Sequence, residues 1–194
     1  MLDNINKYKI VLASKSPRRK ELLGMLDLPF EIKVKDGIDE SYPKDMPAIE
    51  VAEFLARLKG KAYAEEITEN ELVITADTIV ILDEKIYGKP HDEKDAVDML
   101  MQLQGRTHTV ASGVCVATKE KIVSFTTCTA VTFAPLSQEE AEWYVEKYKP
   151  LDKAGAYGIQ EWIGCAAVAG IDGSFYNVMG LPVHQLYNVL KDEF

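Results

Sequence analysis

One stretch near the N-terminus has residue types that suit phosphate binding. An apolar run ends at Ser14 and Ser16, and Pro17, Arg18 and Arg19 follow. Ser16 suits the N-cap and Pro17 the first residue of a helix, whose N-terminal N–H groups and partial positive charge favour an anion. The two arginines add forked donors that match phosphate oxygens. By itself the stretch is equally compatible with a phosphate-binding loop and with an ordinary capped helix.

A second chemical feature is a carboxylate inside an apolar run. Asp77 and Thr78 interrupt residues 72–82, which are otherwise apolar apart from Thr75. Burial of an unpaired carboxylate is costly, so Asp77 either caps a turn or faces a polar cleft. We therefore expect a strand over residues 72–76 that stops at Asp77, and a second strand over residues 79–82.

The elements that must position these residues follow from hydrophobic periodicity and turn signals. The pattern predicts helices beginning at Pro17, Ala48, Asp92, Ser137 and Pro182, the fourth with a capping box formed by Ser137 and Glu140. It predicts strands over residues 8–13, 30–34, 107–118 and 122–133, and a hairpin around residues 170–174 flanked by 166–169 and 175–178. Alternating strands and helices followed by a β-rich region indicate an α/β fold with a mixed sheet.

Composition limits the classes of function. The chain has 194 residues, 47% of them hydrophobic, which is enough for the core of one domain or of two lobes that share a sheet. Lys and Arg number 22 against 31 Asp and Glu, a net charge of −9 that argues against a nucleic-acid-binding module. No apolar run suits a membrane span or a secretory signal. The three cysteines and three histidines are scattered, which indicates free thiols in a reducing cytoplasm and no His-based metal site.

Several short motifs occur in one order along the chain. They are Ala13-Ser14-x-Ser16-Pro17-Arg18-Arg19, Leu55-Ala56-x-x-Lys59, Ala76-Asp77-Thr78, Gly88-Lys89-Pro90, Gly105-Arg106-x-His108-x-Val110, Asp152-Lys153-Ala154-Gly155-Ala156-Tyr157-Gly158-Ile159-Gln160 and Gly180-Leu181-Pro182. Together they resemble the Maf family of nucleoside triphosphate pyrophosphatases, also called septum formation inhibitor proteins, nearly from end to end. The segment that ends at Gln160 resembles the branch that acts on dTTP and UTP.

The resemblance implies a fold and a reaction. The expected fold is ITPase-like: a single domain over residues 1–194, with a long twisted mixed sheet flanked by helices and two lobes around a central cleft, without an independent linker. The expected reaction hydrolyses dTTP and UTP, with modified pyrimidine nucleotides as further candidates, to the monophosphate and pyrophosphate. A divalent cation, Mg²⁺ or Mn²⁺, is the expected cofactor. The resemblance further implies a homodimer. The cysteines indicate the cytoplasm, and the net charge and the lack of a long apolar run argue against nucleic-acid and membrane partners.

The resemblance also implies roles for individual residues. Asp77 falls on the family's proton acceptor, while Glu40 is expected to help hold the metal. A metal-bound carboxylate is a weaker base, so whether Asp77 takes the proton, binds the metal or does both stays open. The phosphate-side positions are Ser14, Arg19, Lys59 and Lys89, of which the two lysines are expected to be catalytic. The specificity positions, which also bind substrate, are Arg18, Thr78 and Gln160.

Other residues are expected to have no role in catalysis. Lys61 is expected to be a solvated lysine, and His108 a structural, hydrogen-bonding histidine. Glu161 departs from the family, which usually has glycine there, and would be strained if that position needs a positive φ. A different class of function, a nucleotide-sensing regulator of septum formation with little turnover, would share the binding residues. Release of pyrophosphate distinguishes the enzyme from the regulator.

Overall fold

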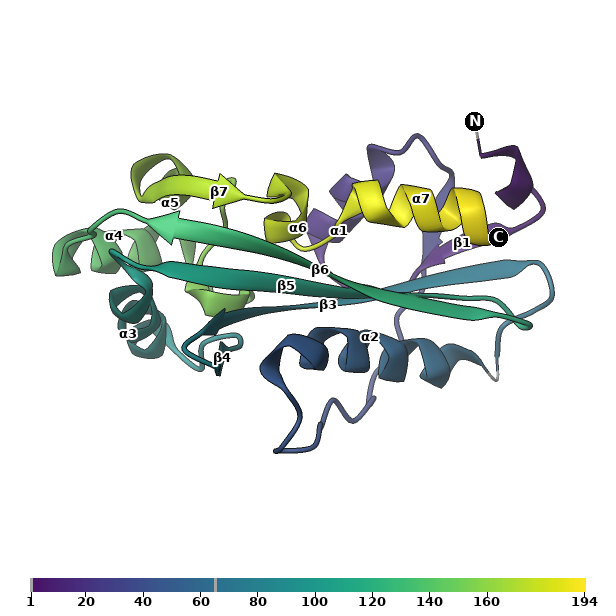
Figure 1. Cartoon of the computed structure of the whole chain (residues 1–194), viewed down its shortest axis with the longest axis horizontal. Coiled ribbons are helices and arrows are strands. Elements are labelled where there is room, and N and C mark those ends of the chain that lie inside the picture. Colours follow the sequence, from purple (N-terminus) through teal and green to yellow (C-terminus); the bar gives the residue numbers. More distant parts are fainter. Residues whose placement is uncertain (1, 65) are drawn as a thin grey trace. The chain divides into compact units, whose positions relative to one another are not determined.

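The computed structural model describes residues 2–64 and 66–194 as an α/β structure (Figure 1). Its strands are β1 (Lys9–Leu12), β2 (Phe30–Ile32), β3 (Glu71–Leu82), β4 (Lys85–Tyr87), β5 (Thr107–Ala117), β6 (Ile122–Phe133) and β7 (Val168–Asp172). Its helices are α1 (Pro17–Gly24), α2 (Ala48–Ala64), α3 (Glu93–Leu103), α4 (Gln138–Tyr148), α5 (Trp162–Ala166), α6 (Phe175–Met179) and α7 (Val183–Glu193), with short 3₁₀ turns η1 (Asp3–Ile5) and η2 (Ala154–Ala156).

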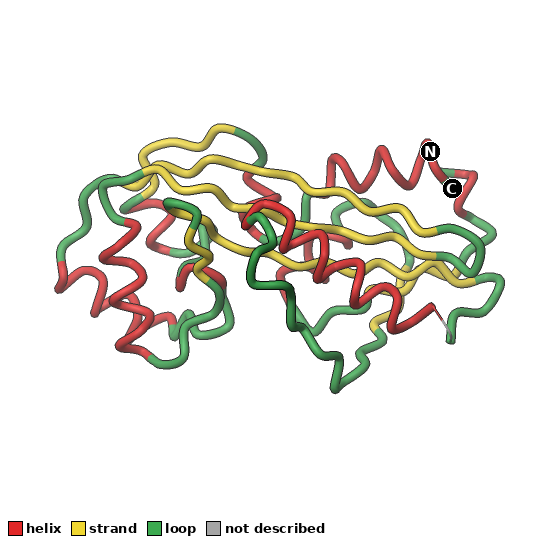
Figure 2. The backbone as a smooth tube through the Cα atoms, turned by 60° about the horizontal axis from the view of Figure 1, so that its bottom comes forward, coloured by secondary structure: helices red, strands yellow, loops and turns green. Residues whose placement is uncertain are grey.

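The strands form one mixed seven-stranded sheet, visible as the yellow segments of Figure 2. The order is β2-β1-β3-β5-β6-β7, with β4 paired to β3. Strand β1 pairs in parallel with β2 and β3, whereas β4 pairs antiparallel with β3 and β7 antiparallel with β6. The predicted α/β class with a mixed sheet is therefore confirmed.

The chain divides into two compact units. Unit 1 comprises Met1–Asp77, Ser112–Thr127 and Gly180–Phe194, and unit 2 comprises Thr78–Ala111 and Cys128–Met179. The expectation of a single domain with a central cleft stays a prediction from the family resemblance.

In unit 1, α2 covers one side of the strands and α7 the other (Figure 1). Val11, Val73 and Cys115 from the strands pack with Ala56 and Tyr63 of α2 in a buried cluster. Glycines let helix and sheet approach closely. A Cβ placed on Gly60 would lie 2.6 Å from Cys115 Sγ, and one on Gly113 would lie 2.2 Å from the backbone of Ala52. This close contact fixes the helix that carries Lys59.

Substitution of Gly113 by alanine is expected to destabilise the protein. The added methyl group meets helix backbone, which cannot move aside as a flexible side chain would. Overpacking of this kind costs about 1–3 kcal/mol, which corresponds to a loss of roughly 2–12 °C in Tm for a chain of this size. Thermal unfolding measures it. Gly24→Ala is the matched control because nothing lies within 4 Å of its added Cβ, and an equal loss there would contradict the packing argument.

In unit 2, α3 packs against α4 and η2. Asp92 caps α3 by accepting from the Asp95 N–H at 2.8 Å, and the predicted capping box of Ser137 and Glu140 begins α4. His108 is buried: its Nε2 lies 2.7 Å from the Tyr157 hydroxyl and its ring packs edge-on against Phe133. The structural role expected for His108 fits these contacts.

The buried His108 predicts a dependence of stability on pH. Burial lowers its pKa from an ordinary 6.5 to about 4. Between these values the unfolded chain binds a proton that the folded chain does not, so the free energy of unfolding falls as pH decreases. The loss from this residue is about 2 kcal/mol at pH 5. Denaturant unfolding at pH 7 and pH 5 should show a smaller change in the free energy of unfolding in His108→Gln than in the wild type.

Substitution of the exposed His184 by glutamine is the control and should leave this change as in the wild type. An equal change in His108→Gln and in the wild type would contradict the role of His108 in the pH dependence.

Two predicted elements are wrong. Strand β3 runs without a break through Asp77 and Thr78, because the Asp77 side chain finds a partner and the backbone can continue its ladder. The expected hairpin around residues 170–174 is also absent. Strand β7 is followed by Gly173, whose φ is +126°, and then by Ser174, which precedes α6 and whose hydroxyl accepts from the Asn177 N–H. Helix α5, which precedes β7, lies where no element was predicted.

Candidate functional site

Three predicted residues converge in unit 1. The Lys59 ammonium lies 2.6 Å from Asp77 Oδ1 and 2.9 Å from Glu40 Oε2. The side chains of Lys59 and Asp77 are 15% and 16% exposed, whereas that of Glu40 is 54% exposed. Helix α2 and strand β3 present the two inner residues, and the loop after β2 supplies Glu40. One ammonium thus holds two carboxylates, one of them at the solvent boundary.

Arg19 supports the strand that carries Asp77. Its guanidinium donates to the carbonyls of Ala76 and Gly180, each at 2.9 Å. Burial lowers the pKa of Arg19 below its ordinary value, and the negative charge of Asp77 opposes that shift. The guanidinium therefore adds positive charge beside Asp77 while bracing the backbone of β3. Sequence reasoning expected phosphate binding at Arg19 and did not anticipate this bracing.

The loop before α1 is held by its own serines. The Ser16 N–H donates to Ser14 Oγ at 3.2 Å, and the Arg19 N–H donates to Ser16 Oγ at 3.4 Å. Pro17 occupies the first turn of α1 with no acidic residue beside it. Arg18 follows on the same turn and is partly exposed. The expected N-cap is confirmed, and its geometry suits an anion.

Two carboxylates are available for a cation. Glu40 and Asp77 both approach Lys59, which places their oxygen atoms around a common point. Mg²⁺ is typically held by one or two carboxylates together with substrate phosphates and water, and this pair fits such a site. Within the described residues, no group of three or more His, Cys, Asp and Glu side chains is arranged to hold a metal without a substrate.

The remaining predicted residues belong to unit 2. Thr78 begins this unit along β3, and Lys89 is an exposed residue just after β4. The carbonyl of Gly88 accepts from the Gly155 N–H at 3.0 Å, which ties the segment of Lys89 to the segment that leads to Gln160. Gly155 has a φ of +66°, and a Cβ there would meet Val80 at 2.8 Å, so glycine is required. Gln160 is exposed.

Comparison with known proteins decides the family. The model of the family described as Maf-like protein matches residues 9–193. The chain belongs to the Maf family. It is 54% identical to a protein of Porphyromonas gingivalis over 99% of this chain and 98% of that protein, and 54% identical to one of Phocaeicola vulgatus over 98% and 99%. A Flavobacterium johnsoniae protein is 47% identical over 97% and 96%. All three relatives are named dTTP/UTP pyrophosphatase.

Two solved structures are also similar. The Staphylococcus aureus Ham1 protein has a TM-score of 0.49 at 16% identity, covering 65% of this chain and 72% of that one. A HAM1 protein from Coxiella burnetii has a TM-score of 0.48 at 14% identity, covering 94% and 98%.

The backbone of Glu161, where the family resemblance implies glycine, is not strained. Its φ is −95°, within the range that any residue adopts, and it is the residue before α5. Its carboxylate accepts from the Tyr144 hydroxyl and lies 3.2 Å from Lys153 Nζ. Neither Tyr144 nor Lys153 was predicted as a site residue. The signal available in the sequence was the departure at Glu161 itself.

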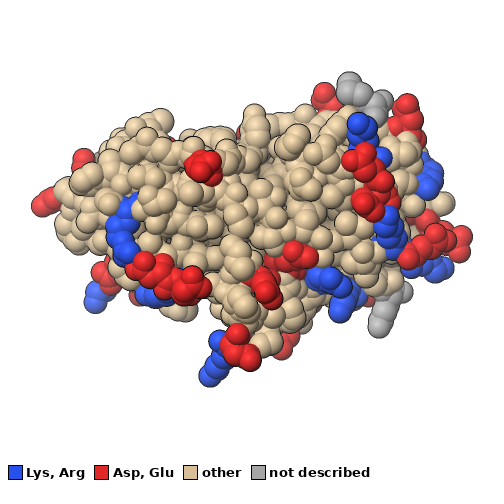
Figure 3. Space-filling model, viewed as in Figure 1, with Lys and Arg blue, Asp and Glu red and all other residues tan. Residues whose placement is uncertain are grey.

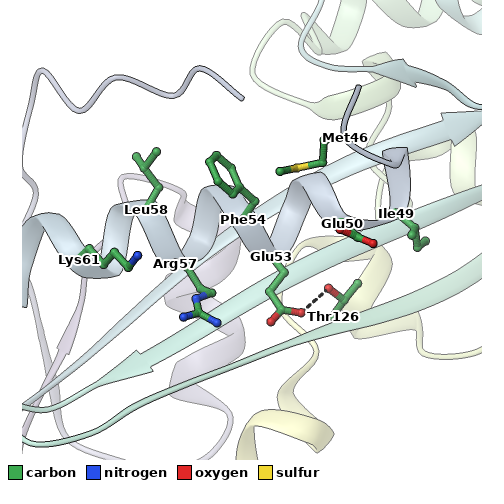
Figure 4. A pocket seen from close by; sticks show the side chains of 9 residues that line it. All are labelled: Met46, Ile49, Glu50, Glu53, Phe54, Arg57, Leu58, Lys61 and Thr126. Carbon is green, nitrogen blue, oxygen red and sulfur yellow. Dashed lines mark hydrogen bonds between the residues drawn. The ribbon is translucent and has the colours of Figure 1, made fainter. Parts of the chain in front are cut away.

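A separate cavity of about 700 Å³ lies on α2 in unit 1 (Figure 4). Its lining residues come from α2, the loop before it and β6: Met46, Ile49, Glu50, Glu53, Phe54, Arg57, Leu58, Lys61 and Thr126. None of the predicted catalytic residues lines it. Lys61 is exposed there, whereas Lys59 contacts Asp77, which agrees with the different interpretations of these two lysines.

Basic and acidic side chains lie close together on the surface. On the face drawn in Figure 3, lysine and arginine side chains lie beside aspartate and glutamate side chains. Unit 1 contains ion pairs such as Lys121–Glu193 and Lys35–Glu66. Within the described part of the chain, no helix is long and apolar enough to cross a membrane.

Proposed function

We propose that this protein hydrolyses dTTP and UTP to the monophosphate and pyrophosphate with a divalent cation as cofactor. The convergence of Lys59, Asp77 and Glu40 carries the proposal, because it supplies an oriented carboxylate and a pair of acidic ligands, with the positive charge of Arg19 beside Asp77. The names of the Porphyromonas and Phocaeicola relatives support the two substrates.

The chemistry follows from a triphosphate's negative charge, since catalysis of phosphoryl transfer rests mostly on positioning and electrostatic stabilisation. Asp77 takes a proton from a water molecule, whose oxygen attacks the α-phosphorus. The bond from the α-phosphorus to its bridging oxygen breaks, and pyrophosphate leaves with that oxygen. Lys59 fixes the Asp77 carboxylate through the 2.6 Å contact. Arg18 and the N-terminus of α1 hold phosphate oxygens.

The cation has two ligands in this proposal, Glu40 and Asp77. A bound divalent cation neutralises phosphate oxygens and stabilises the charge that develops on them. Lys59 keeps the two carboxylates together, which limits their repulsion.

Gln160, Thr78 and Arg18 are proposed to select the nucleotide. A uracil or thymine ring presents both donors and acceptors, and a carboxamide can pair with both kinds of group. Lys89 is proposed to bind phosphate as a second cationic catalytic residue. The family resemblance also supports a cytoplasmic homodimer, which sedimentation of the purified protein would test for its oligomeric part.

A direct assay tests this function. The purified protein with Mg²⁺ or Mn²⁺ is expected to release pyrophosphate from dTTP and UTP, and with ¹⁸O-water the label should appear in the monophosphate. Purine triphosphates at the same concentration serve as controls for base selectivity. Nucleotide binding without pyrophosphate release would instead favour a regulator. Release of inorganic phosphate in place of pyrophosphate would contradict attack at the α-phosphorus.

A further inference from the structure

A buried polar network surrounds the turn that carries Gln160, entirely within unit 2. The Tyr144 hydroxyl donates to a Glu161 carboxylate oxygen and accepts from the Gly158 N–H at 3.0 Å. The other Glu161 oxygen lies 3.2 Å from Lys153 Nζ. The Lys153 side chain is only 9% exposed and that of Glu161 17%, so this pair is largely removed from water.

A backbone hydrogen bond closes the turn between Gly158 and Glu161. The Glu161 N–H donates to the Gly158 carbonyl at 2.9 Å, which places Ile159 and Gln160 at the centre of a tight turn. A Cβ on Gly158 would lie 2.9 Å from Cδ of Glu161 and 3.1 Å from Nε2 of Gln160. The carboxylate and the carboxamide therefore both pack against the same backbone atom. Ile159 is buried, so the turn is anchored on its inner side.

The direction of each hydrogen bond is determined by chemistry. Burial and the neighbouring Glu161 raise the pKa of Tyr144, so its hydroxyl keeps its proton and donates it to the carboxylate. Glu161 accepts that bond, and its other oxygen lies 3.2 Å from the Lys153 ammonium, which also contacts Asp152 at 2.8 Å. A residue without a side-chain acceptor at position 161 could supply neither interaction.

We propose that Tyr144, Glu161 and Lys153 are positioning residues that hold the Gln160 carboxamide in one orientation and so sharpen selection of the pyrimidine base. This proposal rests on the proposed function, because it assigns the network to the residue that reads the base. The contacts of Glu161 with Tyr144 and Lys153 restrain the turn that carries Gln160. The turn then needs less ordering when the nucleotide binds.

The test compares selectivity in matched variants. Glu161→Gly, Glu161→Gln and Tyr144→Phe are assayed with UTP and ATP, and kcat and KM are determined separately. The ratio of kcat/KM for UTP to that for ATP should fall about tenfold in Tyr144→Phe and Glu161→Gly, mainly through a higher KM for UTP, because each change removes charge-assisted hydrogen bonds. Glu161→Gln keeps an acceptor for Tyr144 and should lose less.

Two controls carry the same chemical changes on α4. Tyr148→Phe removes a hydroxyl one helical turn from Tyr144, and Glu142→Gln neutralises an exposed carboxylate. Both should keep the wild-type selectivity ratio. If Tyr144→Phe and Glu161→Gln lowered Tm but left the UTP-to-ATP ratio of kcat/KM unchanged, the network would have only a structural role. That result would overturn the proposal.

A binding measurement separates this proposal from the proposed function. Calorimetry with α,β-methylene analogues of UTP and ATP gives the ratio of the two Kd values without turnover. If the wild type hydrolysed no triphosphate, the proposed function would be rejected. A preference for the UTP analogue over the ATP analogue, measured from the two Kd values, that is weaker in Tyr144→Phe would still support the positioning role of the network. Wild-type protein that binds both analogues equally, or neither, would overturn the positioning role.

Discussion

Asp77→Asn is expected to lower kcat for dTTP and UTP by roughly 10³-fold while the Kd of the nucleotide changes less than tenfold. General-base catalysis is worth about 10²–10⁴-fold, and the amide cannot accept the proton. The amide oxygen can still accept from Lys59, so β3 and α2 should keep their arrangement. Steady-state pyrophosphate release and calorimetry with a non-hydrolysable analogue measure the two quantities.

The matched control is Asp83→Asn. Asp83 follows β3 in the same stretch of chain, but its partner is Arg106 and its side chain is 70% exposed. Exposed ion pairs contribute little to stability, so this variant should keep kcat within twofold. An Asp77→Asn protein that retains more than a tenth of the wild-type kcat would contradict the role of Asp77 as proton acceptor.

Much of the fold was predictable because helices and strands here follow their local patterns. The capping residues Ser16, Asp92 and Ser137 mark three helix starts within one residue. The predicted secondary structure was wrong where a side-chain contact with a residue distant in sequence determines the local structure. The Asp77 side chain reaches Lys59, 18 residues away, and this contact lets the strand continue through an acidic residue. Residues 175–178 form a helix because Ser174 caps it and Asn177 bonds back to Val110 and Thr129.

The candidate site was predictable only in part, for a similar reason. Motif resemblance selects Glu40, Lys59 and Asp77, and the structure brings these three together. Resemblance alone could not separate the bracing of β3 by Arg19 from a phosphate contact, because the acceptors are backbone carbonyls, which carry no sequence signal. It also could not find Tyr144, since a buried tyrosine on an amphipathic helix looks like an ordinary core residue.

Substitution of Lys59, but not of Lys61, is expected to cause a second large loss of activity. Both lysines belong to α2, but Lys59 contacts two carboxylates and Lys61 lines the separate cavity. Lys59→Met is expected to lower kcat/KM by about 10²–10³-fold, because it removes the cation that orients Asp77 and leaves two carboxylates facing each other. Lys61→Met should stay within twofold of the wild type, and Lys59→Arg should recover part of the loss.

A double-mutant cycle tests whether Lys59 acts through Asp77. If the ammonium mainly positions the carboxylate, Lys59→Met should cost little more once Asp77 is already asparagine, because residues that act as a unit are strongly non-additive. The cycle is measured as kcat/KM for UTP in the two single variants and the double variant. Fully additive losses would show instead that Lys59 contributes independently, as a direct phosphate ligand. Thermal unfolding of the same variants separates either result from a loss of folded protein.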